Sequence, residues 1–192
     1  MHLEHASRVI PKEGEKYCGD AVFARNDEKS ALFVLIDALG HGDAAYDVAQ
    51  LGLAVLSDLP SGTDAMAALT ALNARLHGTR GAVATACSFN NKVGQVVGVG
   101  NVLCRAVGFR LSFVPKPGLL GFRNAQPVAT QVELGAGQAL ILHSDGVSQR
   151  FLPDDLLLLA PDAACEQILN RHRYRHDDAG VLVIGRSEER RV

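Results

Sequence analysis

The chain has 192 residues, 47% of them apolar, which is enough for one full-sized domain with a buried core. A formal charge of −2 and a pI near 6.4 leave no basic surface of the kind that nucleic-acid binding requires. No apolar run approaches the roughly 20 residues that span a bilayer, and the N-terminus lacks the apolar core of a signal peptide, so we expect a cytoplasmic protein without nucleic-acid or membrane partners.

The first half of the chain predicts strands followed by a pair of helices. Alternating and continuous apolar runs indicate strands over residues 3–10, 20–25 and 32–36. Apolar residues at helical spacing then run from Gly42 to Pro60, and a second helix is expected between the cap signal at residues 61–63 and Gly78. The two helices are expected to pair and to cover a sheet.

The second half returns to the period of strands. Expected strands are residues 83–89, 93–99, 102–107, 111–114, 130–133, 139–143 and 180–184, with a hairpin turn at 90–92 and helices at 154–159 and 163–171. The charged segment 186–191 is expected to be a solvated tail. Runs of strands with few helices favour an α+β fold built on antiparallel sheet.

One strand places a carboxylate where chemistry needs rigidity. The apolar run over residues 32–36 ends on Asp37, which is followed by the turn-forming residues 38–42. A carboxylate held at the end of a strand suits a metal ligand or a catalytic group. A strand-end aspartate also commonly bonds to the backbone of its own turn. This stretch alone leaves both interpretations open.

Further aspartates repeat this placement elsewhere in the chain. Asp145 follows the strand at 139–143, whereas Asp177 and Asp178 directly precede the last strand, and Asp20 opens the second strand. Because the start of one antiparallel strand lies beside the end of its neighbour, we expect these carboxylates to share one edge of a sheet.

A cluster of this kind predicts a metal site. Neighbouring carboxylates repel and raise each other's pKa unless a cation neutralises them. Ligands that are all oxygen select Mg²⁺ or Mn²⁺, and the sequence offers no paired histidines or thiolates for zinc. Two such ions about 3.5–4 Å apart can clamp a phosphoryl group and activate a water.

The order and spacing of these motifs resemble those of the metal-dependent PP2C-like (PPM) serine/threonine phosphatases. The motifs are Gly19-Asp20, Asp37-Ala38-Leu39-Gly40-His41-Gly42, Ser144-Asp145-Gly146 and Asp177-Asp178. Residues 79–82, 98–102 and 117–121 look like those of the bacterial stress and sporulation branch, in particular the small phosphatases that reset the stressosome. The resemblance implies an α-β-β-α sandwich of two packed antiparallel sheets, formed as a single minimal domain by residues 1–192.

The resemblance also implies roles for the aspartates. Asp37 would bridge two Mn²⁺ or Mg²⁺ ions and, with Asp20, Asp145 and Asp177, form the catalytic centre. The implied metal ligands are Asp20 and the backbone carbonyl of Ala38 on one ion and Asp145 and Asp177 on the other, with Asp178 either beside them or in place of Asp177. The implied reaction is hydrolysis of phosphoserine or phosphothreonine without a phosphoenzyme, on a phosphorylated STAS-domain protein of the stressosome scaffold.

The sequence departs from the family at the turn after Asp37. Ala38 stands where the family usually has glycine, and we expect it to be tolerated, because alanine is costly only where the backbone needs a positive φ. Leu39 stands where the larger enzymes have a histidine, and His41 is left either to act in chemistry or to begin a helix. Ser144 lacks the Gly-x-Ser-x-Gly elbow of a nucleophile.

Two alternatives to a phosphoprotein phosphatase stay open. The chain is either a catalytically silent module that keeps the fold and docks on a signalling partner, or a metal-dependent hydrolase of small phosphate esters. Retention of the aspartates speaks against a silent module.

Overall fold

The computed structural model describes residues 3–90, 93–122 and 127–186. Within these ranges the chain forms strands, three α-helices and one short 3₁₀ helix. In chain order the elements are β1 (Leu3–Ile10), β2 (Asp20–Asn26), β3 (Ser30–Ala38), α1 (Asp43–Asp58), α2 (Ala65–Arg75), β4 (Ala82–Asn90), β5 (Val93–Val99), β6 (Leu103–Val107), β7 (Thr130–Glu133), β8 (Ala139–His143), η1 (the 3₁₀ helix, Pro153–Leu156), α3 (Pro161–His172) and β9 (Ala179–Arg186).

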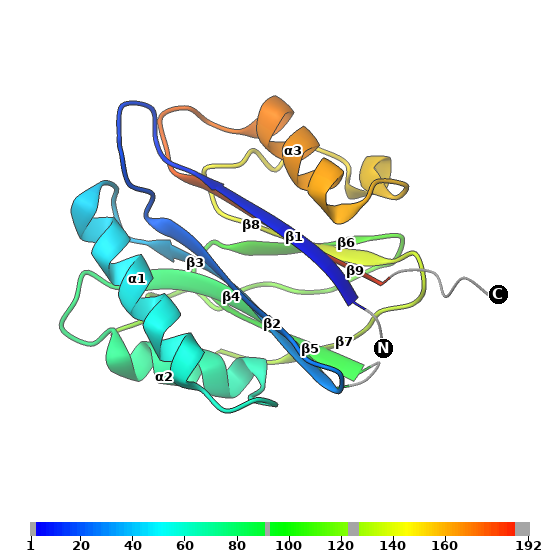
Figure 1. The fold of residues 1–192 in the computed structure, drawn as a ribbon, viewed down its shortest axis with the longest axis horizontal. Helices are drawn as coiled ribbons and strands as arrows, with labels where there is room; N and C mark the ends of the chain where they lie inside the picture. The colour runs from blue at the N-terminus through cyan, green and yellow to red at the C-terminus, as the bar shows by residue number, and fades with distance from the viewer. Residues whose placement is uncertain (1–2, 91–92, 123–126, 187–192) are drawn as a thin grey trace.

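The strands form two antiparallel sheets that pack face to face. One sheet has the order β1-β9-β8-β6 and the other the order β2-β3-β4-β5-β7. Helices α1 and α2 cover the five-stranded sheet, and α3 covers the four-stranded sheet along β1 and β9 (Figure 1). The architecture is therefore the predicted α-β-β-α sandwich, and the α+β class is confirmed.

Strand β3 shows why its sequence is a continuous apolar run. Phe33 and Leu35 point into the core between the two sheets, where they meet residues of β8 and β9. Val34 and Ile36 point the other way, toward the core beneath α1 and α2. Because successive side chains of a strand face opposite sides, a strand buried on both faces must be apolar at every position. This double burial fixes the position of Asp37 at the end of β3.

Most predicted elements are confirmed, with bounds that differ by a few residues, but three details are wrong. Residues 111–114 form no strand, since Pro115 and Pro117 follow directly and cannot donate to a ladder. The helix expected at 154–159 is the 3₁₀ helix η1 alone. Asp64, rather than residues 61–63, caps α2 by accepting a hydrogen bond from Ala67 N at 2.8 Å.

Some predictions fall on parts of the chain that the structure does not describe. Strands β4 and β5 pair as a hairpin, but Asn91 and Lys92 of the predicted turn lie outside the described residues. The same holds for 187–191 in the predicted tail. No helix among the described residues is long and apolar enough to cross a membrane.

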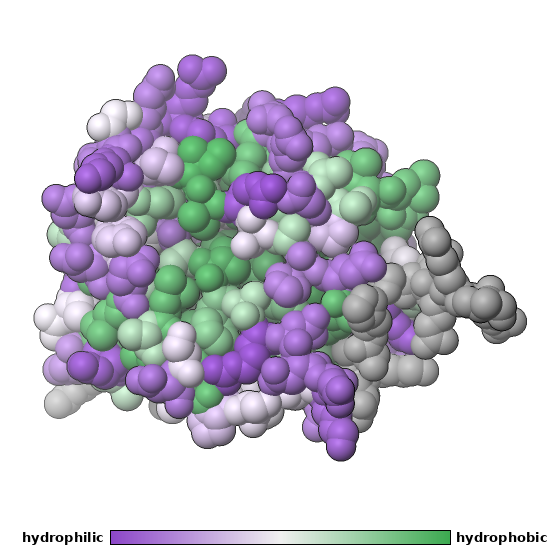
Figure 2. All heavy atoms as spheres, viewed as in Figure 1, coloured by the Kyte–Doolittle hydropathy of each residue, from purple (hydrophilic) through white to green (hydrophobic). Residues whose placement is uncertain are grey.

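Polar and apolar residues share the face of the molecule shown in Figure 2, where apolar spheres run across the middle. A further apolar group lies at the upper right, at the place that η1 occupies in Figure 1. The exposed leucines of this segment are Leu152, Leu157, Leu158 and Leu159.

Candidate functional site

The first pair of predicted carboxylates lies across two neighbouring strands. Asp20 opens β2 and Asp37 lies near the end of β3, and the two are direct partners in the antiparallel register. They lie at the end of the sandwich where α1 begins. Ala38 N donates to Gly19 O at 3.1 Å, which ties the end of β3 to the start of β2.

The other three aspartates come from the second sheet. Asp145 follows β8, and Asp177 and Asp178 precede β9, which pairs with β8. The expectation of one sheet edge is therefore wrong, because the carboxylates meet at one end of a two-sheet sandwich. Pairing within a sheet brings the members of each group together, whereas packing of the sheets brings the two groups together, and strand patterns do not show packing.

A buried serine joins the two groups. Ser144 Oγ donates to Asp20 Oδ2 at 2.6 Å and accepts from Gly180 N at 2.9 Å. Ser144 is fully buried, so this bond holds Asp20 against the second sheet. The chain must also pass closely here: a Cβ on Gly146 would lie 1.7 Å from Asp178 O, so only glycine fits after Asp145.

The carboxylates perturb one another strongly. Burial, followed by the charges of Asp20, Asp145 and Asp177, raises the pKa of Asp37 to about 9. Burial also raises the pKa of Asp20 to about 7, together with repulsion from the neighbouring aspartates and against the lowering effect of its bond from Ser144. The pKa of Asp177 is raised by burial and by Asp145. These carboxylates therefore act as one electrostatic cluster.

The cluster opens into a cavity of about 230 Å³. Three of the predicted aspartates line it, namely Asp37, Asp145 and Asp177, and they come from both sheets. The remaining lining residues are Leu39, Gly40, His41, Val83, Asn101 and Leu119. Asp20 lies deeper, with 3% of its surface exposed.

The structure distinguishes the two adjacent aspartates that the sequence left open. Both carboxylate oxygens of Asp178 accept backbone N–H groups, from Lys12 at 2.7 Å and from Gly19 at 2.8 Å. Asp178 is buried and ties the segments before β2 to the start of β9. Asp177 instead lines the cavity. The geometry thus favours Asp177 as the residue that faces a ligand, and Asp178 as the residue that holds the backbone.

Sequence reasoning assigned no role to Asn101. Asn101 Nδ2 donates to Asp145 Oδ2 at 2.7 Å, and Asn101 also lines the cavity. The residue follows β5 in a turn with no strand or helix pattern, so only the distance to Asp145 reveals its contact. Ser144, whose sequence context does not favour a nucleophile, has a positioning role instead, through its bond to Asp20.

Comparisons with known proteins agree with this geometry. No protein-family model matches the sequence. The phosphoserine phosphatase RsbX of Bacillus subtilis is 27% identical over 180 residues, which cover 88% of this chain and 85% of RsbX. A chain solved in a study of the bacterial stressosome as a modular system that controls secondary messenger signalling is 27% identical, with a TM-score of 0.86 over 96% of this chain and 100% of that chain.

A crystal structure of RsbX in complex with magnesium superposes with a TM-score of 0.84 at 21% identity, covering 95% of this chain and 94% of that one. The chain has the fold of the PP2C-like phosphatases and resembles the RsbX type. Another solved structure of this fold, the catalytic domain of the phosphatase PstP in complex with two manganese ions, has a TM-score of 0.73 at 20% identity and covers 97% of this chain and 99% of its own. Metal ions are thus bound in structures of this fold.

The donor set of this PP2C-like chain fits a hard divalent cation. The cluster consists of carboxylates, and none of the ion pairs formed by the described residues involves Asp20, Asp37, Asp145 or Asp177. The described residues contain no three His, Cys, Asp or Glu side chains already gathered closely enough to hold an ion. Asp20 and Asp145 are instead turned toward Ser144 and Asn101. Binding would therefore require these carboxylates to move closer together, which the charge of the cation favours.

The turn that departs from the PP2C-like pattern has a simple structure. Ala38 is the last residue of β3 and is fully buried against the α1 layer, so its backbone is extended and alanine carries no strain there. His41 does not begin α1, which starts at Asp43. Its ring lies between Glu15, 2.9 Å from Nδ1, and Lys12, 3.0 Å from Nε2. The helix expected after Gly42 is confirmed, and of the two roles left open for His41 the start of the helix is ruled out.

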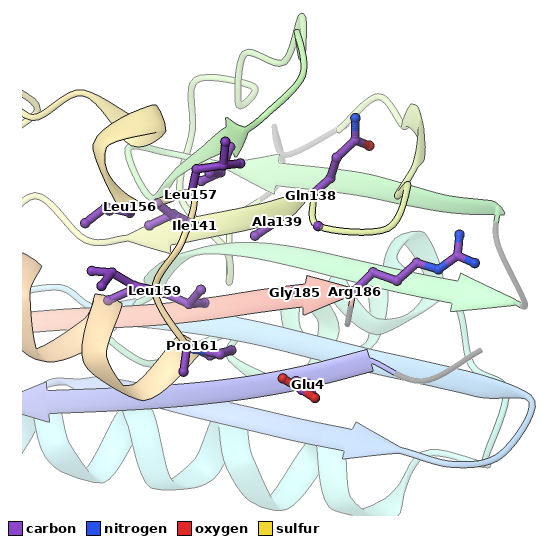
Figure 3. A pocket seen from close by; sticks show the side chains of 15 residues that line it. Glu4, Gln138, Ala139, Ile141, Leu156, Leu157, Leu159, Pro161, Gly185 and Arg186 are labelled. Atoms are coloured by element: carbon purple, nitrogen blue, oxygen red, sulfur yellow. The ribbon is translucent and has the colours of Figure 1, made fainter. Parts of the chain in front are cut away.

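A second cavity of about 160 Å³ lies away from the carboxylates, between the end of the four-stranded sheet and the segment around η1 (Figure 3). Most of its lining residues are apolar, among them Ile141, Leu156 and Leu159. Its charged lining residues are Glu4 and Arg186. It contains none of the predicted site residues.

Proposed function

We propose that this chain is a Mn²⁺- or Mg²⁺-dependent protein phosphatase that hydrolyses phosphoserine or phosphothreonine with two metal ions. One observation carries the proposal: Asp37, Asp145 and Asp177, from two different sheets, line one cavity, where burial and the charges of Asp20, Asp145 and Asp177 raise the pKa of Asp37 to about 9. Such mutual repulsion stores free energy that a divalent cation releases on binding.

The proposed ligand set follows the placement of the side chains. Asp37 would help to hold both ions, because it interacts electrostatically with aspartates of both sheets. Asp20 and the carbonyl of Ala38 would hold one ion, and Asp145 and Asp177 would hold the other. When bound, two such cations would supply charge stabilisation for the phosphoryl group and an activated water for in-line attack.

The remaining residues prepare the site for those cations. Ser144 holds one oxygen of Asp20, and Asn101 holds one oxygen of Asp145, so each carboxylate keeps its other oxygen for a metal. Asp178 fixes the backbone on either side of the cluster through Lys12 and Gly19. Hydrogen bonds of this kind orient a ligand carboxylate and strengthen its binding of a metal ion.

We further propose that the substrate is a phosphorylated STAS-domain protein of the stressosome scaffold. The support is the similarity to the RsbX phosphoserine phosphatase and to a chain from a stressosome study. We propose that residues 1–192 form one such phosphatase domain, since both sheets contribute to a single site. A cytoplasmic location stays a prediction from the sequence.

A metal titration tests the proposal. Purified protein treated with a chelator is titrated with Mn²⁺, and hydrolysis is measured first with p-nitrophenyl phosphate and then with a phosphorylated STAS-domain protein. We expect turnover of both substrates to rise with Mn²⁺, and to be lost in Asp37→Asn. Asp58→Asn, the same chemical change at the exposed far end of α1, serves as the control and should keep full activity.

Each failure identifies an alternative. Absence of metal-dependent turnover with both substrates would leave a silent module that binds a partner. Turnover of the small ester alone would leave a hydrolase of small phosphate compounds. Unchanged turnover in Asp37→Asn would refute the bridging role of that residue.

A further inference from the structure

A leucine at the mouth of the carboxylate cavity is held rigidly and yet faces solvent. Leu39 N donates to Gly81 O at 3.1 Å, and Leu39 O accepts from Arg80 Nη1 at 2.9 Å. Both backbone groups of Leu39 are therefore fixed by the segment that enters β4. Its side chain nevertheless has 56% of its surface exposed. A rigid backbone that presents an apolar side chain to water is a preformed contact surface.

A second leucine lies beside it, over the same glycine. A Cβ on Gly81 would lie 2.8 Å from Leu119 Cγ and 2.7 Å from Leu120 O, and the φ of Gly81 is +82°. Leu119 can occupy this position only because residue 81 is glycine. Leu120 N and O are bonded in turn to Ala82 O and N, at 2.8 and 3.3 Å. The loop that carries Leu119 is thus anchored as firmly as the turn that carries Leu39.

The two leucines and Val83 line the same cavity as Asp37, Asp145 and Asp177. We call Leu39, Val83 and Leu119 the apolar wall. A phosphoryl group and its metal ions interact with the charged part of this cavity and gain nothing from apolar contact. The wall therefore faces a different part of the substrate, one that enters together with the phosphate.

We infer that the apolar wall selects phosphorylated segments in which an apolar side chain adjoins the phosphorylated residue. The inference rests on the proposed function and adds a sequence preference to it. A side chain that leaves water for this wall contributes in proportion to the apolar area buried. Removing such a contact typically changes specificity on the order of tenfold.

Phosphopeptides that differ at one position test the inference. Four peptides share one polar sequence with a single phosphoserine. One pair differs only in the residue directly before the phosphoserine, which is leucine or serine. The other pair differs in the same way at the residue directly after it. The value of kcat/KM is measured for each peptide with Mn²⁺, for the wild-type chain and for Leu39→Ser, Leu39→Met and Leu119→Ser. Leu158→Ser is the matched control, since Leu158 is 96% exposed and lies outside the carboxylate cavity.

We expect the wild-type chain to prefer leucine over serine on at least one side of the phosphoserine, by on the order of tenfold in kcat/KM. Leu39→Ser and Leu119→Ser should lower this ratio to roughly threefold or less. Leu39→Met, which keeps an apolar side chain, and Leu158→Ser should both retain it. A ratio between two peptides is unaffected by partial unfolding, because both rates fall equally.

Two other results overturn the inference in distinguishable ways. If the wild-type chain hydrolyses all four peptides with equal kcat/KM, the apolar wall selects nothing, while the proposed phosphatase activity stands. The same conclusion follows if the preference survives in both Leu39→Ser and Leu119→Ser. If the wild-type chain hydrolyses neither p-nitrophenyl phosphate nor any of the four peptides, the proposed function itself fails, and the inference fails with it.

Discussion

The substitution Asp37→Asn should stabilise the metal-free chain while it abolishes metal-dependent activity. Burial and the charges of Asp20, Asp145 and Asp177 raise the pKa of Asp37 to about 9, so the folded chain takes up a proton that the unfolded chain releases at neutral pH. Asparagine is similar in size to aspartate and carries no charge. The substitution removes the cost of burying and protonating this carboxyl and keeps a side chain of the same shape at the end of β3.

The size of the effect follows from the pKa. Holding a proton on Asp37 at pH 7, against an ordinary pKa of 3.8, costs about 4 kcal/mol relative to the unfolded chain. Because Asp20 and its neighbours share protons with Asp37, the substitution recovers only part of this, and we expect roughly 2 kcal/mol. For a chain of this size such a gain raises the Tm by about 5 °C.

The sign of the pH dependence separates this effect from general stabilisation. A carboxyl group whose pKa is higher in the folded chain does not destabilise the fold below about pH 4. It destabilises the fold increasingly as the pH rises toward 9. The advantage of Asp37→Asn should therefore be small at pH 5 and large at pH 8, as measured by thermal unfolding in the presence of a chelator. Adding Mn²⁺ should reverse the order at pH 8, because it stabilises the wild-type chain more.

The reasoning is refuted if the metal-free variant is less stable than the wild-type chain at pH 8, or if the difference between the two is the same at pH 5 and pH 8. Either result would mean that burial and the neighbouring charges do not raise the pKa of Asp37 in the folded chain. Asp58→Asn, at an exposed position, should show no dependence of this kind.

Three further predictions follow from individual contacts. Asp177→Asn should weaken Mn²⁺ binding, measured by calorimetry, without loss of folding. Asp178→Asn should instead lower the free energy of unfolding by about 1–3 kcal/mol, because it removes an acceptor of backbone N–H groups. Equal effects of the two substitutions on Mn²⁺ affinity would contradict this distinction. Asn101→Ala should weaken Mn²⁺ binding by about 10-fold or more, because Asp145 loses its orienting bond, and unaltered affinity would argue against that role. Ala38→Gly should cost about 1 kcal/mol in urea unfolding and leave kcat nearly unchanged, so a large gain in kcat would show that the methyl group hinders the site.

Local patterns were sufficient to predict most of the fold. The run at 32–36 is apolar at every position because β3 is buried on both faces, and the strands at 130–133 and 139–143 were predicted with their observed bounds. The prediction failed where tertiary contacts replace local ones. Asp154 illustrates this, since its side chain accepts a hydrogen bond from Gly108 N at 2.9 Å and η1 ends after one turn.

The candidate site was predictable in part, for a physical reason. Asp20, Asp37 and Asp145 stand at strand ends, so the strand pattern locates them along the chain. Asp20 and Asp37 meet by pairing within one sheet, but their meeting with Asp145 depends on how two sheets pack, and only the resemblance to PP2C-like phosphatases indicated two packed sheets. Asn101 lies in a turn with no periodic pattern, and its contact with Asp145 joins residues 44 positions apart.

Hydrogen bonding favours one of the two adjacent aspartates, Asp177, as the metal ligand, a choice that the strand pattern left open. Asp177 accepts one bond, from Asp178 N to its Oδ1 at 3.0 Å, and its other oxygen remains for a cation. Asp178 uses both oxygens on backbone N–H groups, so a cation there would have to replace two bonds in a buried place. Asp20 and Asp145 each commit one oxygen, as Asp177 does. The residues proposed as ligands are therefore those with an oxygen to spare, and Asp178 supports them by keeping its own occupied.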